Sequence, residues 1–180
     1  MEKYKKMNKI QKLLNTGDLR TIGKSEDVVK LVLSNPPLFR DVVNAILSDT
    51  PGIRMRASDA AEKITQIHPE WLNPYKKLFL DTISKISQQE VRWHTAQMLP
   101  RLVLTKSERK NVFDLLLIYL EDKSRIVKTS AMQALADIAI QDNTYLNQVQ
   151  RILNVLIKKG SPAMKARGNK LLLVLEKVKI

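Results

Sequence analysis

Few side chains in this sequence have the types and spacing that catalysis or metal binding needs. The two histidines, His68 and His94, lie 26 residues apart, and no grouping of histidine with acidic residues has metal-ligand spacing. The glycine-rich phosphate-binding patterns GxxxxGK[ST] and GxGxxG are absent, and there is no cysteine. The sequence therefore predicts no catalytic residue, no cofactor and no metal, and a protein that is not an enzyme.

Binding chemistry is better represented, because Trp93 stands in a stretch that also holds cations, VRWHTAQMLPR. Tryptophan and arginine dominate binding hot spots, and an indole can stack on a nucleic-acid base. The alternative is that Trp93 packs against a neighbouring element, as large aromatic side chains usually do. For Trp71, which follows His68 and Pro69, the packing role is favoured more strongly.

The net charge is +13 over 180 residues, and the excess lies at the two ends of the chain. Residues 1–24 hold seven cations and two acids, and residues 143–180 hold eight cations and one acid, whereas the middle is nearly balanced. Nearly acid-free ends predict an acidic partner, either protein or nucleic acid. The terminal cations expected to contact it are Lys5, Lys6, Lys9, Lys158, Lys159 and Lys177.

Composition indicates a globular helical protein, with 44% hydrophobic residues, 27% charged residues and only 5 glycines. No signal peptide and no apolar run of about 18 residues is visible, so we expect no membrane span. With no cysteine in the chain, a reducing compartment is the natural expectation. We therefore expect a cytoplasmic protein with a macromolecular partner and no small-molecule substrate.

Mostly apolar or small residues recur along the chain with the offsets i, i+4, i+7, i+8 and i+11, the spacing of one face of an α-helix. We call such a set of residues a stripe. Its starts are separated by 38, 36 and 37 residues, and each is followed by a cation expected to pair with acids or carbonyls nearby. The i+4 position holds a small residue in three of the four copies, which predicts close helix packing. The stripes begin at Ile53, Val91, Val127 and Met164.

A second stripe, with offsets i, i+3, i+4, i+7 and i+8, alternates with the first. Turn-forming segments such as SDTPG and KKGSP separate the two, with Pro51 and Pro162 suited to helix starts and Ser124 and Ser161 to N-caps. The pattern predicts an all-α fold, an α-solenoid of about five stacked helical hairpins. The second stripe begins at Phe39, Tyr75, Val112 and Val149.

The phrases VRWHTAQML and VKTSAMQAL resemble the V-R-x-x-A-x-x-A-L core of HEAT and HEAT-like repeats, which have an armadillo-like fold. The resemblance covers residues 37–180 as four hairpins and implies a right-handed superhelical stack that serves as a binding scaffold. Residues 1–36 lack the phrase and are expected to form degenerate N-terminal capping helices of the same continuous domain.

In such repeats the second helix of each hairpin lines the surface where extended partners bind. At 100° per residue, the side chains opposite or flanking the core stripe stand at i+2, i+3, i+6 and i+10. We expect these positions to form the partner-binding face. The residues selected are Met55, Arg56, Trp93, His94, Gln97, Arg101, Gln133, Arg167 and Lys170.

Three functions fit these features. The first is a non-catalytic scaffold that binds an acidic protein segment through this face and the basic ends. The close alternative is a nucleic-acid-binding protein whose terminal cations contact phosphates. A remoter possibility is a cleft similar to that of the HEAT-like DNA glycosylases, in which Trp93 would work with Asp59 or Asp137; it rests on fold analogy alone.

Overall fold

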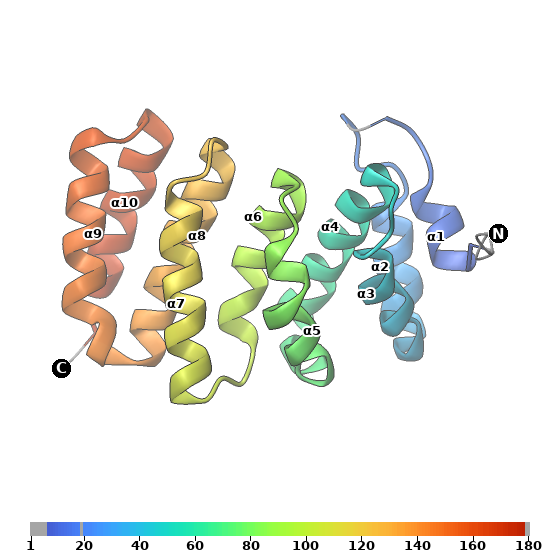
Figure 1. Ribbon diagram of the computed structural model, residues 1–180, viewed down its shortest axis with the longest axis horizontal. Coiled ribbons are helices and arrows are strands. Elements are labelled where there is room, and N and C mark those ends of the chain that lie inside the picture. Colours follow the sequence, from blue (N-terminus) through green and yellow to red (C-terminus); the bar gives the residue numbers. More distant parts are fainter. Residues whose placement is uncertain (1–6, 19, 179–180) are drawn as a thin grey trace. The chain divides into compact units, whose positions relative to one another are not determined.

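A computed structural model describes residues 7–18 and 20–178 of the chain. Within these residues the protein consists of ten α-helices and five short 3₁₀ helices, with no β-strand, which confirms the all-α class (Figure 1). The chain divides into two compact units, residues 1–95 and 96–180, and the dividing point lies within α6.

In the first unit, helix α4 is the central element. Helices α1, α2 and α3 and the 3₁₀ helix Pro69–Tyr75 all pack against it. Two further 3₁₀ helices, Pro36–Leu38 and Ile83–Lys85, connect neighbouring α-helices. The α-helices are α1 (Lys9–Leu14), α2 (Ser25–Ser34), α3 (Phe39–Ala45), α4 (Pro51–Ile67), α5 (Lys76–Asp81) and α6 (Gln89–Met98).

In the second unit, each helix packs against the next along the chain. Helix α7 (Lys106–Leu120) pairs with α8 (Arg125–Gln141), and α9 (Leu146–Lys159) pairs with α10 (Pro162–Leu175). Helix α8 also contacts both α9 and α10, so it lies at the centre of this unit. The 3₁₀ helices Leu99–Arg101 and Asn143–Tyr145 pack on α8 as well.

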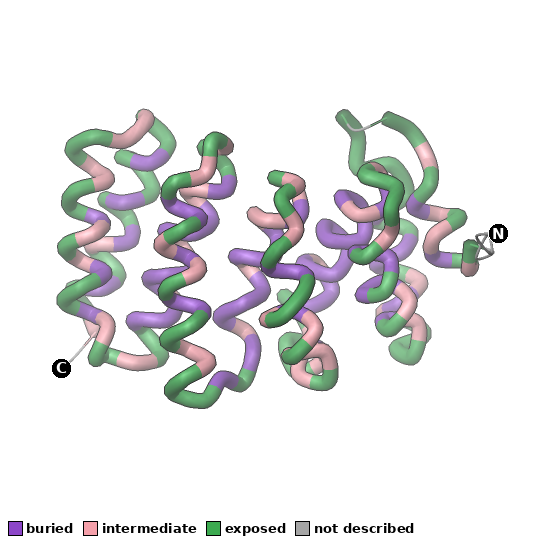
Figure 2. Tube along the Cα trace, viewed as in Figure 1, coloured by how far each residue is buried: buried purple, intermediate pink, exposed green. Residues whose placement is uncertain are grey.

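The recurring stripe forms the core, as the periodicity predicts. On α8 its five members are all fully buried, and on α4 none is more than 1% exposed (Figure 2). The small residues at i+4 are buried too, and a Cβ added to Gly168 would lie only 2.6 Å from Cγ1 of Ile157. Close packing of α10 on its neighbours therefore requires glycine at that position.

Prolines shorten two helices that the stripes predict to be longer. The expected helix over residues 75–83 is reduced to α5. It begins only at Lys76, because Pro69 and Pro74 hold the preceding segment in a 3₁₀ helix, and it ends at Asp81, before the exposed Thr82. Helix α6 ends at Met98, ahead of Pro100, although Leu102 at the end of its stripe is still buried.

The predicted helix starts are largely confirmed. Pro51 and Pro162 occupy the first position of α4 and α10, and the Ser161 side chain accepts a hydrogen bond from the Met164 amide. Ser124 stands at the N-cap position of α8, but its side chain makes no capping hydrogen bond. Unpredicted capping boxes begin α1 at Asn8 and α7 at Thr105.

Candidate partner-binding site

Helix α4 carries a buried arginine whose three guanidinium nitrogens each donate a hydrogen bond to a backbone carbonyl. Arg56 is 1% exposed and donates hydrogen bonds to the carbonyls of Leu14 (3.1 Å), Thr21 (3.2 Å) and Asp18. All three acceptors flank or belong to the loop between α1 and α2. Arg56 therefore fixes this loop to α4, and its charge is not offered to a partner.

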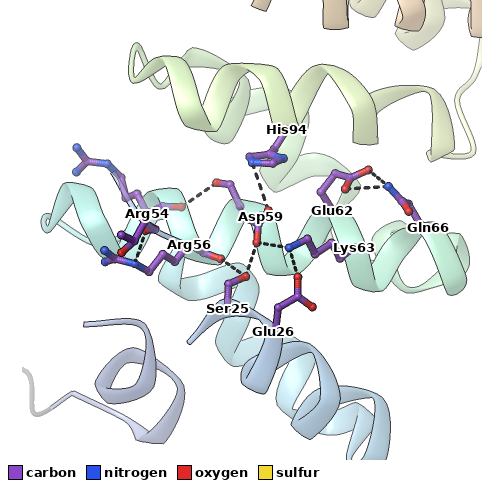
Figure 3. A network of polar contacts seen from close by, with 11 residues as sticks. Ser25, Glu26, Arg54, Arg56, Asp59, Glu62, Lys63, Gln66 and His94 are labelled. Atoms are coloured by element: carbon purple, nitrogen blue, oxygen red, sulfur yellow. Dashed lines mark hydrogen bonds and ion pairs between the residues drawn. The ribbon is translucent and has the colours of Figure 1, made fainter. Parts of the chain in front are cut away.

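A second polar group on α4, Asp59, joins three helices (Figure 3). Its carboxylate accepts hydrogen bonds from the Ser25 hydroxyl of α2 and from the Lys63 ammonium (2.9 Å), and it lies 3.9 Å from Nε2 of His94 on α6. Lys63 also binds Glu26 of α2. Burial opposes the charge of Lys63, but its bonds to Glu26 and Asp59 outweigh burial and raise its pKa, so the ammonium stays charged.

Ser25, Asp59 and His94 are the residue types of a nucleophilic triad, but their geometry is different from one. The serine hydroxyl bonds the carboxylate rather than the imidazole, and Ser25 is fully buried. A nucleophile must instead be within reach of its base and of the substrate. The arrangement joins α2, α4 and α6, and the described residues hold no group of three or more potential metal-ligating side chains.

Three residues expected on an exposed face are instead buried: Met55 (7% exposed), Arg56 and His94 (9%). The expectation of exposure is wrong for Met55 and Arg56 because α1, α2, α3 and a 3₁₀ helix pack against α4, and for His94 because its ring on α6 lies against Asp59 of α4. Trp93 is half-buried, and its ring lies 5.2 Å from the His94 ring at an angle of 58°.

Trp71 packs as predicted. Its ring stacks on His68, with centroids 4.4 Å apart, and lies 5.8 Å from Phe39. Two of the four cations that follow the stripe starts bond nearby carbonyls as expected: Arg54 donates to Ser48 at 2.8 Å, and Arg92 to Ile86 at 3.3 Å. These aromatic and cationic side chains serve local packing.

The second unit gathers the predicted residues on a more open face. Gln133 of α8 accepts a hydrogen bond from Arg167 of α10 at 2.9 Å and donates one to Asp137 at 2.8 Å. Burial raises the pKa of Asp137, against the effects of Gln133, Arg101 and Arg167. Gln133 and Arg101 are half-buried, and so is Gln97 in α6, whereas Arg167 and Lys170 are exposed.

The end of this unit is a cationic surface with a single acid, Glu176, between residues 143 and 178. Its cations are exposed, and none makes an ion pair within the described part of the chain. Lys9 is likewise exposed on α1, whereas Lys5 and Lys6 lie outside the described residues. The exposed cations are Arg151, Lys158 and Lys159 of α9, Lys165, Arg167 and Lys170 of α10, and Lys177 just after it.

Sequence reasoning missed the bond between Ser25 and Asp59 and the closure of the α1–α2 loop over Arg56. The signal available was slight: Asp59 and Lys63 have the i, i+4 spacing of a helical ion pair, but nothing in the loop indicates three carbonyl acceptors. No family model, curated protein or solved structure matched this chain. No helix in the described residues is long and apolar enough to cross a membrane.

Proposed function

We propose that the protein is a HEAT-like helical solenoid that acts as a non-catalytic scaffold and binds an acidic protein segment. The binding surface is the cationic end of α9 and α10 together with the adjoining face of α8. The observation that carries this proposal is that the cations of this surface are exposed and make no ion pair with any carboxylate of the described residues.

Electrostatics supports an acidic partner. Elsewhere in the chain, cations such as Lys63, Arg109 and Lys110 are paired with carboxylates at 2.6–2.9 Å. At the α9–α10 end the exposed cations make no ion pair within the described residues, and a surface of predominantly one sign attracts and orients a partner of the opposite sign. Solubility alone requires charge, but not one sign.

Exposed apolar side chains among these cations favour a protein over a nucleic acid. Val155 of α9 is 53% exposed, and Leu173 and Val174 of α10 are 61% and 47% exposed. A phosphate backbone offers such side chains nothing to bury. Aromatic rings for stacking on bases are not offered by this unit, since its described aromatic residues are buried or, like Tyr145, packed on Phe113.

We infer a non-catalytic role from the geometry of the polar residues around α4, which are Ser25, Arg56, Asp59 and Lys63. The Ser25 side chain is buried, the Arg56 guanidinium donates hydrogen bonds to backbone carbonyls, and the Asp59 carboxylate accepts hydrogen bonds from Ser25 and Lys63. These groups bond one another or the backbone, as the polar groups of a structural network do, whereas a catalytic site would leave some of them accessible to substrate.

The proposal is tested by fluorescence anisotropy of a labelled glutamate-rich peptide at low and high salt. We expect binding at low salt that weakens as salt rises, and loss of most of the affinity when three cations of the surface are reversed together. The variant carries the changes Lys158→Glu, Lys159→Glu and Lys170→Glu.

A matched variant controls for net charge alone. Reversal of three other exposed cations of the same unit changes the total charge equally and should leave most of the binding. Equal loss in both variants, or no binding of any acidic peptide at low salt, would contradict the proposal. The control changes are Lys106→Glu, Lys123→Glu and Arg125→Glu.

Nucleic acid is the second candidate, favoured by the near absence of acids between residues 143 and 178. The same experiment with labelled single- and double-stranded DNA and RNA separates the two. Tighter binding of an oligonucleotide than of the peptide, with a steep salt dependence, would establish phosphate contacts instead. A further loss in Trp93→Ala would add base stacking.

A further inference from the structure

Helix α10 presents a second stripe of side chains, distinct from the one buried in the core. Its members stand at position 163, at the adjacent pair 166–167, at 170 and at the adjacent pair 173–174. Successive positions are thus three or four residues apart, and together they cover about a third of the helix circumference. Every one of them is exposed, and Lys177 continues the stripe in the turn after the helix. The members within α10 are Ala163, Ala166, Arg167, Lys170, Leu173 and Val174.

Alternation of three and four residues is the spacing at which one α-helix packs along another. The two alanines at the start of the stripe permit a close approach, and Leu173 and Val174 at its end provide apolar area to bury. Arg167 and Lys170 stand between them, so a helix seated here would have to meet two cations at its centre.

Helix α8 shows what becomes of the same positions when another helix lies against them. The residues 37 positions earlier include Gln133 in place of Lys170 and Ala136 in place of Leu173. On α8, Ala136 is fully buried and Gln133 bonds Arg167 of α10, which packs on α8. The stripe of α8 is thus largely covered in the folded protein, although Ile126 at its start is 54% exposed, whereas the whole stripe of α10 is open.

We propose that the open stripe of α10 docks an amphipathic α-helix of the partner, with an apolar seam flanked by aspartate and glutamate. This inference rests on the proposed function and specifies the partner's structure. The occupant follows from charge complementarity: acidic side chains beside the seam pair with Arg167 and Lys170 while its leucines cover Leu173 and Val174. A second copy of this chain would set its own α10 cations against them, which is unfavourable.

Two synthetic peptides of identical composition separate this inference from general attraction of acids. The first places leucine at alternating intervals of three and four residues with glutamate elsewhere, so that a helix gathers the leucines on one face; the second has the same residues in scrambled order. We expect the patterned peptide to bind at least about tenfold more tightly and to gain helical circular dichroism on binding.

Equal binding of both peptides would overturn the docking of a helix and leave the proposed function standing. Binding of neither peptide at low salt would overturn both.

Two charge reversals on one helix locate the site. Lys170 belongs to the stripe, whereas Lys165 is exposed on another side of α10. We expect Lys170→Glu to weaken binding of the patterned peptide by about tenfold, and Lys165→Glu, which changes the charge of the cationic surface but not the stripe, to weaken it by about threefold or less. Equal effects would overturn the placement on the stripe. Unchanged circular dichroism of the free variants shows that both still fold.

The lack of cysteine permits a direct check of the placement. In Ala166→Cys the new thiol stands in the stripe, and in Asn169→Cys it stands beside it on the same helix, exposed in both cases. A patterned peptide whose single seam cysteine is activated as a mixed disulfide with 2-thiopyridine should exchange rapidly with the thiol of the first variant and slowly with that of the second, releasing 2-thiopyridone. Equal rates would contradict a helix lying along the stripe.

Discussion

Arginine stands at the same position of the repeated stripe in α4 and in α10, three residues after its start, yet the two side chains have opposite surroundings. Arg56 is 1% exposed and donates to three backbone carbonyls, whereas Arg167 is exposed and donates to one side-chain amide. The neighbour decides the difference, because the loop between α1 and α2 covers Arg56 and no such loop covers Arg167. Repeated positions therefore need not share a role.

The same contrast extends to the acids of the two units. Asp59 is tied to Ser25 and Lys63 within a closed network, whereas Asp137 has one amide partner and two arginines near a half-covered surface. The buried charges of the first unit thus join packed helices. In the second unit the cations of α9 and α10 are exposed and make no ion pair within the described residues.

The largest expected effect comes from removing the buried guanidinium. In Arg56→Met the carbonyls of Leu14, Asp18 and Thr21 lose their donor, which should reduce the free energy of unfolding by about 3 kcal/mol. Urea denaturation measures this loss. Binding of the acidic peptide by the folded variant should be unchanged, and a stability loss below about 1 kcal/mol would show that other contacts hold the loop.

Neutralising the centre of the α4 network should have the next largest effect. In Asp59→Asn the Ser25 hydroxyl and the Lys63 ammonium lose a charged acceptor, at an expected cost of about 1–2 kcal/mol in the free energy of unfolding. Asp114→Asn is the control, because that carboxylate pairs with Lys110 on an exposed surface. An equal loss in the free energy of unfolding for both variants would show that the buried network stabilises the fold no more than an exposed ion pair does.

Truncation of the open arginine should separate stability from binding. Arg167→Ala removes one exposed hydrogen bond to Gln133 and should change the free energy of unfolding by less than about 0.5 kcal/mol. The affinity for the acidic peptide should nevertheless fall severalfold, as measured by anisotropy. A large loss of stability with unchanged affinity would show that Arg167, like Arg56, stabilises the fold and does not contribute to binding.

The smallest expected effect concerns pH. Since burial raises the pKa of Asp137, the folded protein disfavours its charged form, and Asp137→Asn should raise the melting temperature slightly at pH 7. The gain should vanish as the pH falls to about 4 and below, where the wild-type carboxyl is protonated as well. The acidic peptide should also bind somewhat better to Asp137→Asn, because a like charge has gone.

Asp142→Asn provides a control of opposite sign. Bonds from Thr144 and Arg109 lower the pKa of Asp142, so its charged form stabilises the fold above its ordinary pKa and the benefit is lost as the pH falls through the lowered value. The substitution should lower the melting temperature at pH 7. A shift of the same sign in both variants would show that the two environments do not differ.

Much of the fold could be predicted from the sequence, because periodicity reports directly which side of a helix is buried. The stripes on α4 and α8 are covered throughout, and the turns fall where proline, glycine and serine mark them. Periodicity does not report how long a helix continues beside a proline. This is why α5 and α6 are shorter than their stripes.

The site was harder to predict, because the exposure of a helix face depends on what packs against it. Arg56 and Arg167 share a position in the pattern, and only the loop from Thr16 to Lys24, which does not repeat, distinguishes them. Its contacts with Arg56 are made by backbone carbonyls, which every residue type has. Spacing did identify Gln133, Arg167 and Lys170 as neighbours on one face, because those positions lie on helices that follow the pattern.

The glycines of that loop limit how freely it can change over evolutionary time. Gly17 and Gly23 have φ angles of 72° and 52°, which other residues rarely adopt, and a Cβ on Gly23 would lie 2.8 Å from Nε of Arg56. Surface loops commonly accept substitutions and insertions with little effect. This one should tolerate neither at its two glycines, and replacing Arg56 would relieve only one of the close contacts at Gly23, leaving the positive φ of both residues in place.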